Sequence, residues 1–267
     1  MSFRGCAPGC KASWAGCPGC GCVMLKGMPG HLSNPELCTP PGGLLLGIDT
    51  CGPMGTVALG RVSGSEVEIL GQIELEGRSY SATLVAAVGQ LLAGAGLALR
   101  ELAGIVAVSG PGSFTGVRVG LAAVKGLAEG ARIPVVAVSR LEVLARMAGL
   151  PAAALDAHRH EVFLRVGGPG LEPGEMLAGA AELAAITPAP RRIAVCDDAA
   201  AALLGSAWPE AERLRLPAPT AADALALGAA RMAAGDFADL AMLDGHYLRR
   251  SDAEIFGEPA AAGPPGA

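Results

Sequence analysis

The chain has 267 residues, of which 51% are hydrophobic but only 3% aromatic, so alanine, leucine and valine must build most of the core. Its formal net charge is −5 at pH 7, and no cluster of lysine and arginine is visible along it. A protein that grips a nucleic acid through phosphates usually carries a basic face. If a nucleic acid is the ultimate substrate, we therefore expect another protein to hold it.

Residues 1–42 are dense in glycine, proline and cysteine and show no periodic apolar pattern. The segment 17–20 reads Cys-Pro-Gly-Cys and admits a zinc knuckle, but the spacing matches no metal motif closely. We predict a disordered extension or an over-long translation start, with Met24 and Met28 as later starts. The cysteines concerned are Cys6, Cys10, Cys17, Cys20, Cys22 and Cys38.

No apolar signal-peptide region is present, so the chain is expected in the cytoplasm with Cys51 and Cys196 reduced. Residues 258–267, rich in proline, alanine and glycine, are predicted to be disordered. Residues 79–99 carry no charge and are long enough to cross a bilayer. Their polar residues, their glycines and the helical spacing of their leucines favour a buried or interface helix instead.

The first half predicts strands at residues 44–49, 56–59 and 67–75, then the uncharged helix, then a strand at 105–109. Residues 110–120, Gly-Pro-Gly-Ser-Phe-Thr-Gly-Val-Arg-Val-Gly, follow that strand and open a second helix. A turn of this kind accommodates either an anion or a closely approaching backbone. It is neither a Walker A motif nor a dinucleotide fingerprint, and its spacing favours a structural turn. A strand at 134–138 and a helix from residue 141 complete the half.

The second half repeats the opening. A strand ending in Asp156 turns into a returning strand at 161–165, as the strand ending in Asp49 turns into residues 56–59. Helices near 180–185 and 199–204, a strand at 193–196 and a long helix at 221–234 follow. Hairpin strands followed by alternating helices and strands predict an α/β fold with mixed sheets covered by helices.

Three further segments accompany the run 110–120: residues 44–50 (Leu-Leu-Leu-Gly-Ile-Asp-Thr), 154–163 (Ala-Leu-Asp-Ala-His-Arg-His-Glu-Val-Phe) and 245–250 (Gly-His-Tyr-Leu-Arg-Arg). In this order they closely resemble the TsaB (YeaZ) family, over about residues 44–250. The resemblance implies an actin-like ATPase fold with a first lobe at 43–139 and a second lobe with the C-terminal segment at 140–257.

The resemblance also implies a function. TsaB is the non-catalytic dimerisation subunit of the bacterial machinery that makes threonylcarbamoyladenosine in tRNA. It would pair directly with TsaD, work in a complex with the ATPase TsaE, follow TsaC in the pathway and meet tRNA only through the complex. Two helices, at about 81–92 and 114–128, would form the contact with TsaD. In the absence of TsaD, the same surface would pair two copies of this chain. The contact residues expected on them are Thr83, Leu84, Val88, Leu91, Phe114, Thr115, Val117, Arg118, Leu121, Val124 and Lys125.

No residue is predicted to be catalytic, and no cofactor is required. Asp49 and Thr50 are candidates for a weak ATP or ADP contact, with turn capping as the alternative for Asp49 and for Asp156. His158, His160 and Glu161 invite a metal reading, but a solvated turn is favoured. Tyr80 stands where relatives often have histidine. An actin-like small-molecule kinase and a metallopeptidase remain alternatives. A kinase would need a second glycine-rich loop and a metallopeptidase a helical histidine pair, and neither is visible in this sequence.

Overall fold

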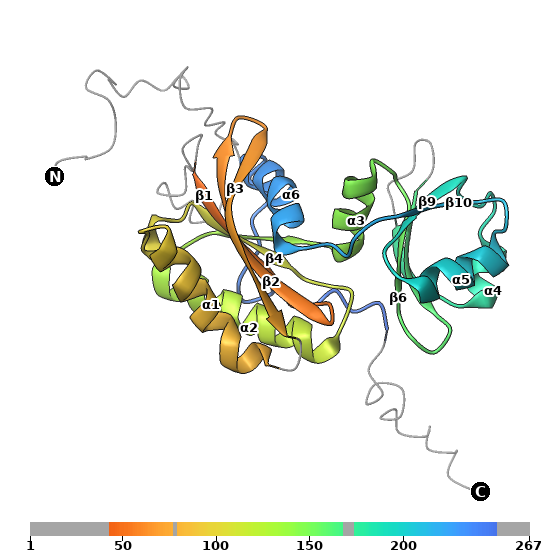
Figure 1. The fold of residues 1–267 in the computed structure, drawn as a ribbon, viewed down its shortest axis with the longest axis horizontal. Helices are drawn as coiled ribbons and strands as arrows, with labels where there is room; N and C mark the ends of the chain where they lie inside the picture. The colour runs from red at the N-terminus through yellow and green to blue at the C-terminus, as the bar shows by residue number, and fades with distance from the viewer. Residues whose placement is uncertain (1–42, 77–78, 168–173, 250–267) are drawn as a thin grey trace, which may run out of the picture. The chain divides into compact units, whose positions relative to one another are not determined.

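Two five-stranded mixed sheets form the core of the computed structural model, which describes residues 43–76, 79–167 and 174–249 (Figure 1). The predictions for residues 1–42 and 258–267 lie outside the described residues. In the part that is described, no helix is long and apolar enough to cross a membrane, and the uncharged segment forms a helix of 15 residues.

The first sheet has the strand order β3-β2-β1-β4-β5. β1 is central and pairs antiparallel with β2 and parallel with β4. On the outer sides, β2 pairs antiparallel with β3, and β4 pairs parallel with β5. A bulge interrupts the β2–β3 register between Leu59 and Gly60. The strands are β1 (Leu44–Asp49), β2 (Met54–Ser63), β3 (Glu66–Glu76), β4 (Gly104–Val108) and β5 (Val135–Val138).

The second sheet has the order β10-β9-β6-β7-β8, which is the same pattern read from the other edge. β6 pairs antiparallel with β7 and parallel with β9, as β1 pairs with β2 and β4. The repeated opening read from the sequence is therefore a repeated topology. The strands are β6 (Ala153–Asp156), β7 (Val162–Val166), β8 (Gly174–Ala178), β9 (Arg192–Val195) and β10 (Glu212–Arg215).

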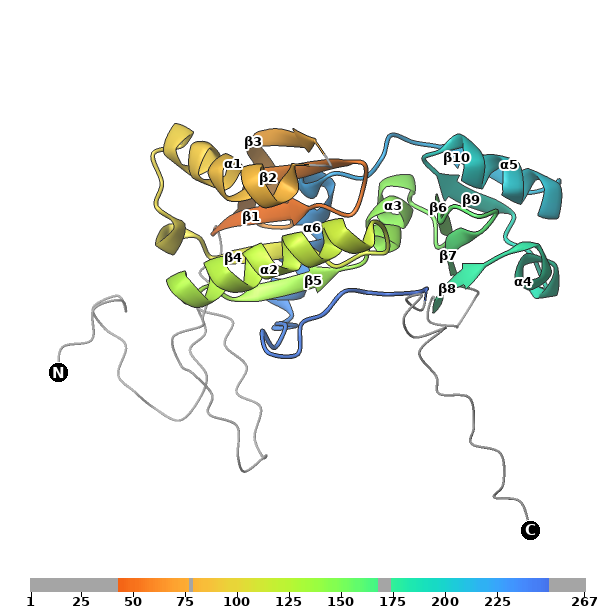
Figure 2. The same ribbon diagram turned by 90° about the horizontal axis from the view of Figure 1, so that it is seen from below.

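The first sheet is covered on both faces. α1 (Tyr80–Gly94) and α2 (Phe114–Ala131) lie side by side on one face, and α6 (Ala221–Ala233) lies on the other (Figures 1 and 2). A short 3-10 turn, η1 (Leu99–Glu101), precedes β4. α3 (Arg140–Ala148), α4 (Ala180–Ala185) and α5 (Asp198–Ala207) pack on the second sheet.

The position of α6 differs from the expected division at residues 139 and 140. This helix follows the second sheet in sequence but packs against all five strands of the first. Small residues permit the close approach: a Cβ added at Gly228 would lie 2.2 Å from a methyl of Val106, and one at Gly47 would lie 2.7 Å from the carbonyl oxygen of Ala221. The first lobe is thus built from residues that precede the second sheet in the sequence and from residues that follow it.

The predicted helices and central strands agree with the structure to within a few residues at their ends. The prediction missed β8 and β10, which are the two edge strands of the second sheet. β10 exposes charged residues at three of its four positions, whereas β8 exposes Gly174 and Met176, and neither strand has the buried apolar run of a central strand. Their sequences, Gly-Glu-Met-Leu-Ala and Glu-Arg-Leu-Arg, carry little strand signal of their own.

Glu175 on β8 joins three parts of the chain. Its carboxylate accepts hydrogen bonds from Ser139 Oγ at 2.7 Å and Arg165 Nη1 at 2.7 Å, and contacts His246 Nε2 at 2.8 Å. Burial alone would raise the pKa of Glu175, but the hydrogen bonds with His246, Ser139 and Arg165 hold this pKa below its ordinary value. The carboxylate therefore links β8 to β7, to the start of α3 and to the C-terminal segment.

Glu175→Gln is expected to flatten the acid limb of the stability profile. A carboxyl whose pKa is lowered on folding contributes stability above its unfolded pKa, and this contribution is lost as the pH falls through the folded pKa. Urea unfolding between about pH 6 and pH 3 should show a steeper loss in the unaltered chain than in the variant, starting near pH 4.5. Parallel profiles for the two proteins would contradict the role given to Glu175.

Candidate functional site: the turn after β1 and the face of α1 and α2

The glycine-rich run packs against the turn that follows β1. A Cβ at Gly112 would lie 2.2 Å from the carbonyl oxygen of Cys51, and one at Gly116 would lie 2.1 Å from that of Thr50. A Cβ at Gly120 would lie 2.1 Å from Thr50 Oγ1. No side chain fits at such distances, so Gly112 and Gly116 let backbone meet backbone and Gly120 leaves room for the Thr50 side chain, as the structural interpretation of the run predicts.

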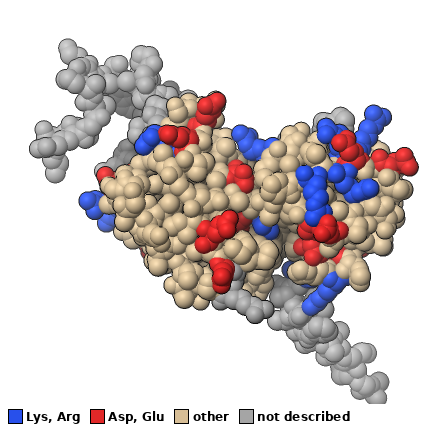
Figure 3. Space-filling view, viewed as in Figure 1, with Lys and Arg blue, Asp and Glu red and all other residues tan. Residues whose placement is uncertain are grey.

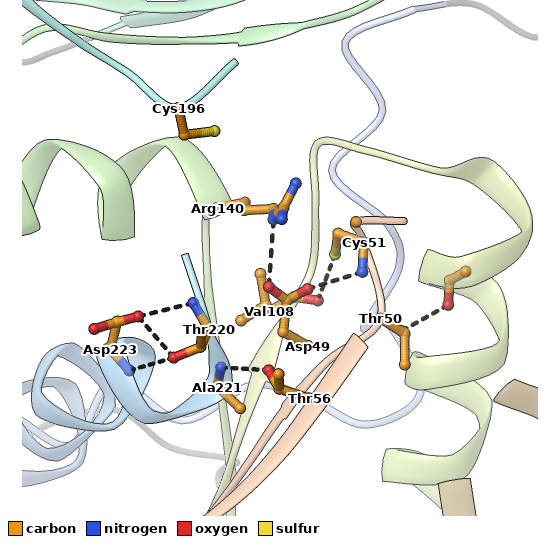
Figure 4. A network of polar contacts seen from close by, with 12 residues as sticks. Asp49, Thr50, Cys51, Thr56, Val108, Arg140, Cys196, Thr220, Ala221 and Asp223 are labelled. Carbon is orange, nitrogen blue, oxygen red and sulfur yellow. Dashed lines mark hydrogen bonds and ion pairs between the residues drawn. The ribbon is translucent and has the colours of Figure 1, made fainter. Parts of the chain in front are cut away.

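Several polar groups of this run bond to other groups of the chain. Ser113 caps α2, and its Oγ accepts a hydrogen bond from the Gly116 N–H at 3.3 Å. The Ser113 N–H donates to Cys51 O at 2.8 Å, and Thr50 Oγ1 donates to Gly116 O at 2.7 Å (Figure 4). The turn after β1 and the start of α2 therefore form one bonded unit.

Asp49, the last residue of β1, is only 1% exposed and forms a buried ion pair with Arg140, the first residue of α3. Arg140 Nε lies 3.3 Å from Asp49 Oδ2, and Asp49 Oδ1 accepts the Cys51 N–H at 2.8 Å (Figure 4). Burial opposes the charge on Arg140, but the field of Asp49 raises the pKa of the guanidinium, which stays charged. The pair ties the first sheet to a helix that packs on the second.

The titratable groups around this pair are held in their neutral forms. Burial, then the nearby Asp49 charge, raises the pKa of the Cys51 thiol well above its ordinary value. Burial raises the pKa of Cys196 to about 11, and that of Tyr80 to about 12. The Tyr80 hydroxyl donates to Gly52 O at 2.8 Å. Neutral, buried thiols are poor nucleophiles, and this tyrosine holds the turn rather than moving protons.

Asp49 and Thr50 were the sequence candidates for a nucleotide contact. Both are 1% exposed, and both use their side chains on protein partners, Asp49 on Arg140 and Cys51, and Thr50 on Gly116. The residues present therefore do not fit a nucleotide or its magnesium ion, because such a ligand would first have to displace Arg140 from Asp49.

The equivalent turn of the second half is exposed. Asp156 ends β6, and its Oδ1 accepts the His158 N–H at 2.8 Å, the same i to i+2 bond that Asp49 makes with Cys51. Asp156 thus caps its turn, as favoured from the sequence. His158, Arg159 and His160 are exposed and adopt φ values of 60°, 55° and 60°. Left-handed backbone costs a residue with a side chain about 1–2 kcal/mol.

No metal site is formed by the described residues. Within residues 43–76, 79–167 and 174–249, His, Cys, Asp and Glu side chains gather in no group of three that could hold a metal ion. His158 Nδ1 instead pairs with Asp156 Oδ2 at 2.8 Å, and Glu161 pairs with Arg249. The zinc knuckle considered for residues 1–42 lies outside the described residues.

The expected contact residues of α1 and α2 divide into two sets. The first set is buried in the chain's own core, where a partner cannot touch it: Leu84, Val88, Val117, Leu121 and Val124. This corrects the expectation for those residues, since the apolar residues at helical spacing cover the sheet. The second set is exposed or half-buried: Thr83, Leu91, Phe114, Thr115, Arg118 and Lys125.

The outward surface of the two helices consists mostly of alanine and glycine, whereas the contact residues expected from the sequence included leucines and valines that are in fact buried. α1 has no charged residue, and the surface over it is uncharged in Figure 3. Val85, which is 58% exposed, is the largest of the exposed apolar side chains of α1, since the others are alanines. We call this surface the small-residue face; its exposed members are Ala82, Val85, Ala86, Gly89 and Ala93 on α1 and Thr115, Arg118, Ala122 and Gly126 on α2.

An aromatic cluster adjoins the small-residue face at the start of α2. The Arg118 guanidinium lies 3.7 Å from the centre of the Phe114 ring, and its Nε donates to the Tyr247 hydroxyl at 3.3 Å. The two rings are 5.2 Å apart. Tyr247 cannot be placed here from the sequence, because it follows Arg118 by 129 residues. Its similarity to the Tyr-Leu-Arg close of the TsaB family was the available signal.

Comparison with known proteins agrees with this architecture. A family model described as "TsaD: tRNA N6-adenosine threonylcarbamoyltransferase" matches residues 70–242, more than half of the chain. The tRNA threonylcarbamoyladenosine biosynthesis protein TsaB of Haemophilus influenzae is 36% identical over 125 residues, which cover 45% of this chain and 51% of that protein. An uncharacterized protein of Mycobacterium tuberculosis is 32% identical over 159 residues, 53% of this chain and 74% of that one.

Among solved structures, an uncharacterized Pseudomonas aeruginosa protein "with similarity to peptidase YEAZ" superposes with a TM-score of 0.62 at 26% identity. The match covers 78% of this chain and all of that one. Two related mixed sheets with flanking helices, shared with such neighbours, define an α/β protein of the actin-like ATPase fold. The chain belongs to the TsaB (YeaZ) family. It spans about half the length of the curated TsaB relatives it matches.

Gly116→Ala is expected to lower the free energy of unfolding by about 3 kcal/mol, because its methyl group would overlap the Thr50 carbonyl. Gly126→Ala on the same helix is the matched control, since nothing lies within 4 Å of its Cβ position. The control should gain up to about 1 kcal/mol from helix propensity. Urea unfolding of both variants measures this; equal effects would contradict the close packing of the turn.

Arg140→Ala is expected to cost about 3–5 kcal/mol, because it leaves the Asp49 carboxylate buried without a counter-ion. The double variant Asp49→Asn/Arg140→Met removes both charges and should be more stable than Arg140→Ala alone. Thermal and urea unfolding of the two variants measure the difference. A double variant that is less stable than the single one would show that the pair is not the dominant interaction here.

Proposed function

We propose that this chain is a non-catalytic subunit of the machinery that makes threonylcarbamoyladenosine in tRNA, and that it acts by binding TsaD through the small-residue face. Family membership supports the pathway. The match to the TsaD family model supports the choice of partner, because a partner related in sequence would share the fold and its pair of outer helices. Two similar helix pairs can then meet about an approximate two-fold axis.

The single observation that carries the binding mode is the composition of the exposed surface of α1 and α2. Alanine, glycine and valine dominate it, and α1 carries no charge. Small side chains let helices approach closely, and the α1 part of the face, which carries no charge, loses little on leaving water. A contact of standard size buries about 1,600 Å² in total, which two helices from each partner can supply.

A catalytic role is not proposed for the turn after β1. Its acidic residue is paired with Arg140, its thiol is buried and neutral, and its backbone packs directly against Gly112 and Gly116 of the glycine-rich run. The same contacts weigh against the kinase alternative. We propose that TsaE joins the complex, that TsaC supplies the activated threonylcarbamoyl group, and that without TsaD the small-residue face pairs with a second copy of the chain.

Val85→Arg is expected to abolish binding to TsaD and, with it, tRNA threonylcarbamoylation by TsaC, TsaD and TsaE in the presence of this chain. The residue is 58% exposed, so the stability of the subunit should change by less than about 0.5 kcal/mol. Calorimetric titration with TsaD and a modification assay measure the two effects.

Met176→Arg on β8 is the matched control, because it replaces an apolar residue that is 41% exposed on the second sheet. It should bind TsaD like the unaltered chain. Normal binding by Val85→Arg would rule out the small-residue face. Modification that proceeds fully without the chain would overturn the proposed function itself.

A further inference from the structure

The start of α2 presents an arginine whose head group is oriented by two aromatic rings. The Arg118 guanidinium lies 3.7 Å from the centre of the Phe114 ring and 5.9 Å from the centre of the Tyr247 ring. Its Nε donates a hydrogen bond to the Tyr247 hydroxyl at 3.3 Å. Stacking on an aromatic face and a bond through Nε restrict the rotation of the flat guanidinium. The group is therefore oriented before any partner arrives.

The Tyr247 ring is itself held in place by the chain. It packs on the backbone of Gly245, where an added Cβ would lie 2.5 Å from the ring. The Tyr247 N–H donates to Gly245 O at 3.0 Å, and the neighbouring His246 N–H donates to Ser109 O at 2.8 Å. Ser109 directly follows β4, so the C-terminal segment is tied to the first sheet at this point. Tyr247 is thus a fixed support for Arg118.

The outer side of the Arg118 guanidinium is available to a ligand. The residue is exposed, and no carboxylate of residues 43–76, 79–167 or 174–249 forms an ion pair with it. Within that part of the chain, the hydrogen bond through Nε is the one that its head group makes, so Nη1 and Nη2 have no partner. The paired N–H groups of a guanidinium match the two oxygens of a carboxylate.

The surroundings of Arg118 favour a single carboxylate over the backbone of a nucleic acid. α1 is uncharged, and the other charged residues of α2 are Lys125 and Glu129. Phosphate backbones are bound by several cations together, whereas one oriented arginine suits one carboxylate on a protein surface. Glu129 follows Arg118 by three helical turns, about 16 Å along the axis, so it cannot pair with Arg118 of the same chain.

We infer that Arg118 receives a carboxylate of TsaD at the edge of the small-residue face, and that Phe114 and Tyr247 position it for this contact. The contact lies within the interface of the proposed function and rests on it. A partner that covers α1 and α2 also removes the guanidinium from water, and a cation left there without an anion would oppose binding. Arg118 thereby selects a partner that supplies the anion. From its own α1 and α2, a second copy of the chain offers Glu129 alone.

Arg118→Gln is titrated calorimetrically with TsaD at about 50 mM and about 300 mM salt, beside the unaltered chain and Lys125→Gln. It should bind TsaD at least about tenfold more weakly at low salt, since charge-assisted hydrogen bonds are lost. Its affinity should also depend less on salt, a change that lost packing alone would not produce. Lys125→Gln is the matched control, because it removes the same charge from the same helix, and should stay within about threefold.

Two further variants test how the guanidinium is positioned. Arg118→Lys keeps the charge but not the planar pair of donors, and should recover only part of the lost affinity. Tyr247→Phe keeps the ring but removes the hydroxyl that accepts the Arg118 Nε–H, and should bind TsaD with an affinity between those of Arg118→Gln and the unaltered chain. Unchanged binding by Tyr247→Phe would contradict the positioning role of its hydroxyl.

Equal TsaD affinity and salt dependence in Arg118→Gln and the unaltered chain would overturn the inference. Sedimentation without TsaD is the second arm. If Arg118→Gln and Glu129→Gln both weaken self-association while TsaD binding is unchanged, the carboxylate belongs to a second copy. If Arg118→Gln instead weakens only the binding of tRNA by the assembled complex, the ligand is a phosphate.

Val85→Arg separates a failure of this inference from a failure of the proposed function. If Val85→Arg abolishes TsaD binding and Arg118→Gln does not weaken it, the small-residue face stands and the carboxylate contact is wrong. If neither variant changes TsaD binding, the proposed function is wrong as well.

Discussion

The buried ion pair between Asp49 and Arg140 is the interaction on which the rest of the structure depends. It joins the last residue of β1 to the first residue of α3, and so connects a strand of the first sheet to a helix that packs on the second. The Cys51 N–H and the Gly110 carbonyl, which accepts the Arg140 N–H at 2.7 Å, hold the two partners in place. A charge pair this deep is stable only if both partners stay, since either one alone would be a buried, uncompensated charge.

The same pair occupies the acidic turn after β1, where Asp49 was the candidate for a nucleotide contact. The acidic turn after β1 and the glycine-rich run at α2 are both present, yet each is filled by the protein itself. The glycines that would allow a ligand to approach the backbone instead allow Thr50 and Cys51 to do so. The repeated turn in the second half is the open one, and there the residues are exposed and basic.

The resemblance of four short segments was sufficient for the family and its fold, and apolar runs and glycine signals, which reflect local constraints, were sufficient for the central elements. It could not reveal which side of α1 and α2 faces outward, since leucine and valine at helical spacing suit a core and an interface alike. Leu84 and Val88 proved to face the sheet, and Val85 the solvent. Contacts between distant segments, such as Arg249 with Glu161 or Tyr247 with Arg118, depend on tertiary folding and leave no pattern along the chain.

The placement of α6 has a consequence for synthesis on the ribosome. All strands of the second sheet have emerged once β10 has been made. The first sheet, whose strands emerge earlier, gains the helix that covers one of its faces only when α6 follows β10. Until then the face of the first sheet that carries Gly47 and Val106 lacks the contacts that α6 makes with it. The order of folding is therefore expected to reverse the order of translation: the half that is made second can close first, and the half that is made first depends on the last helix for its completion.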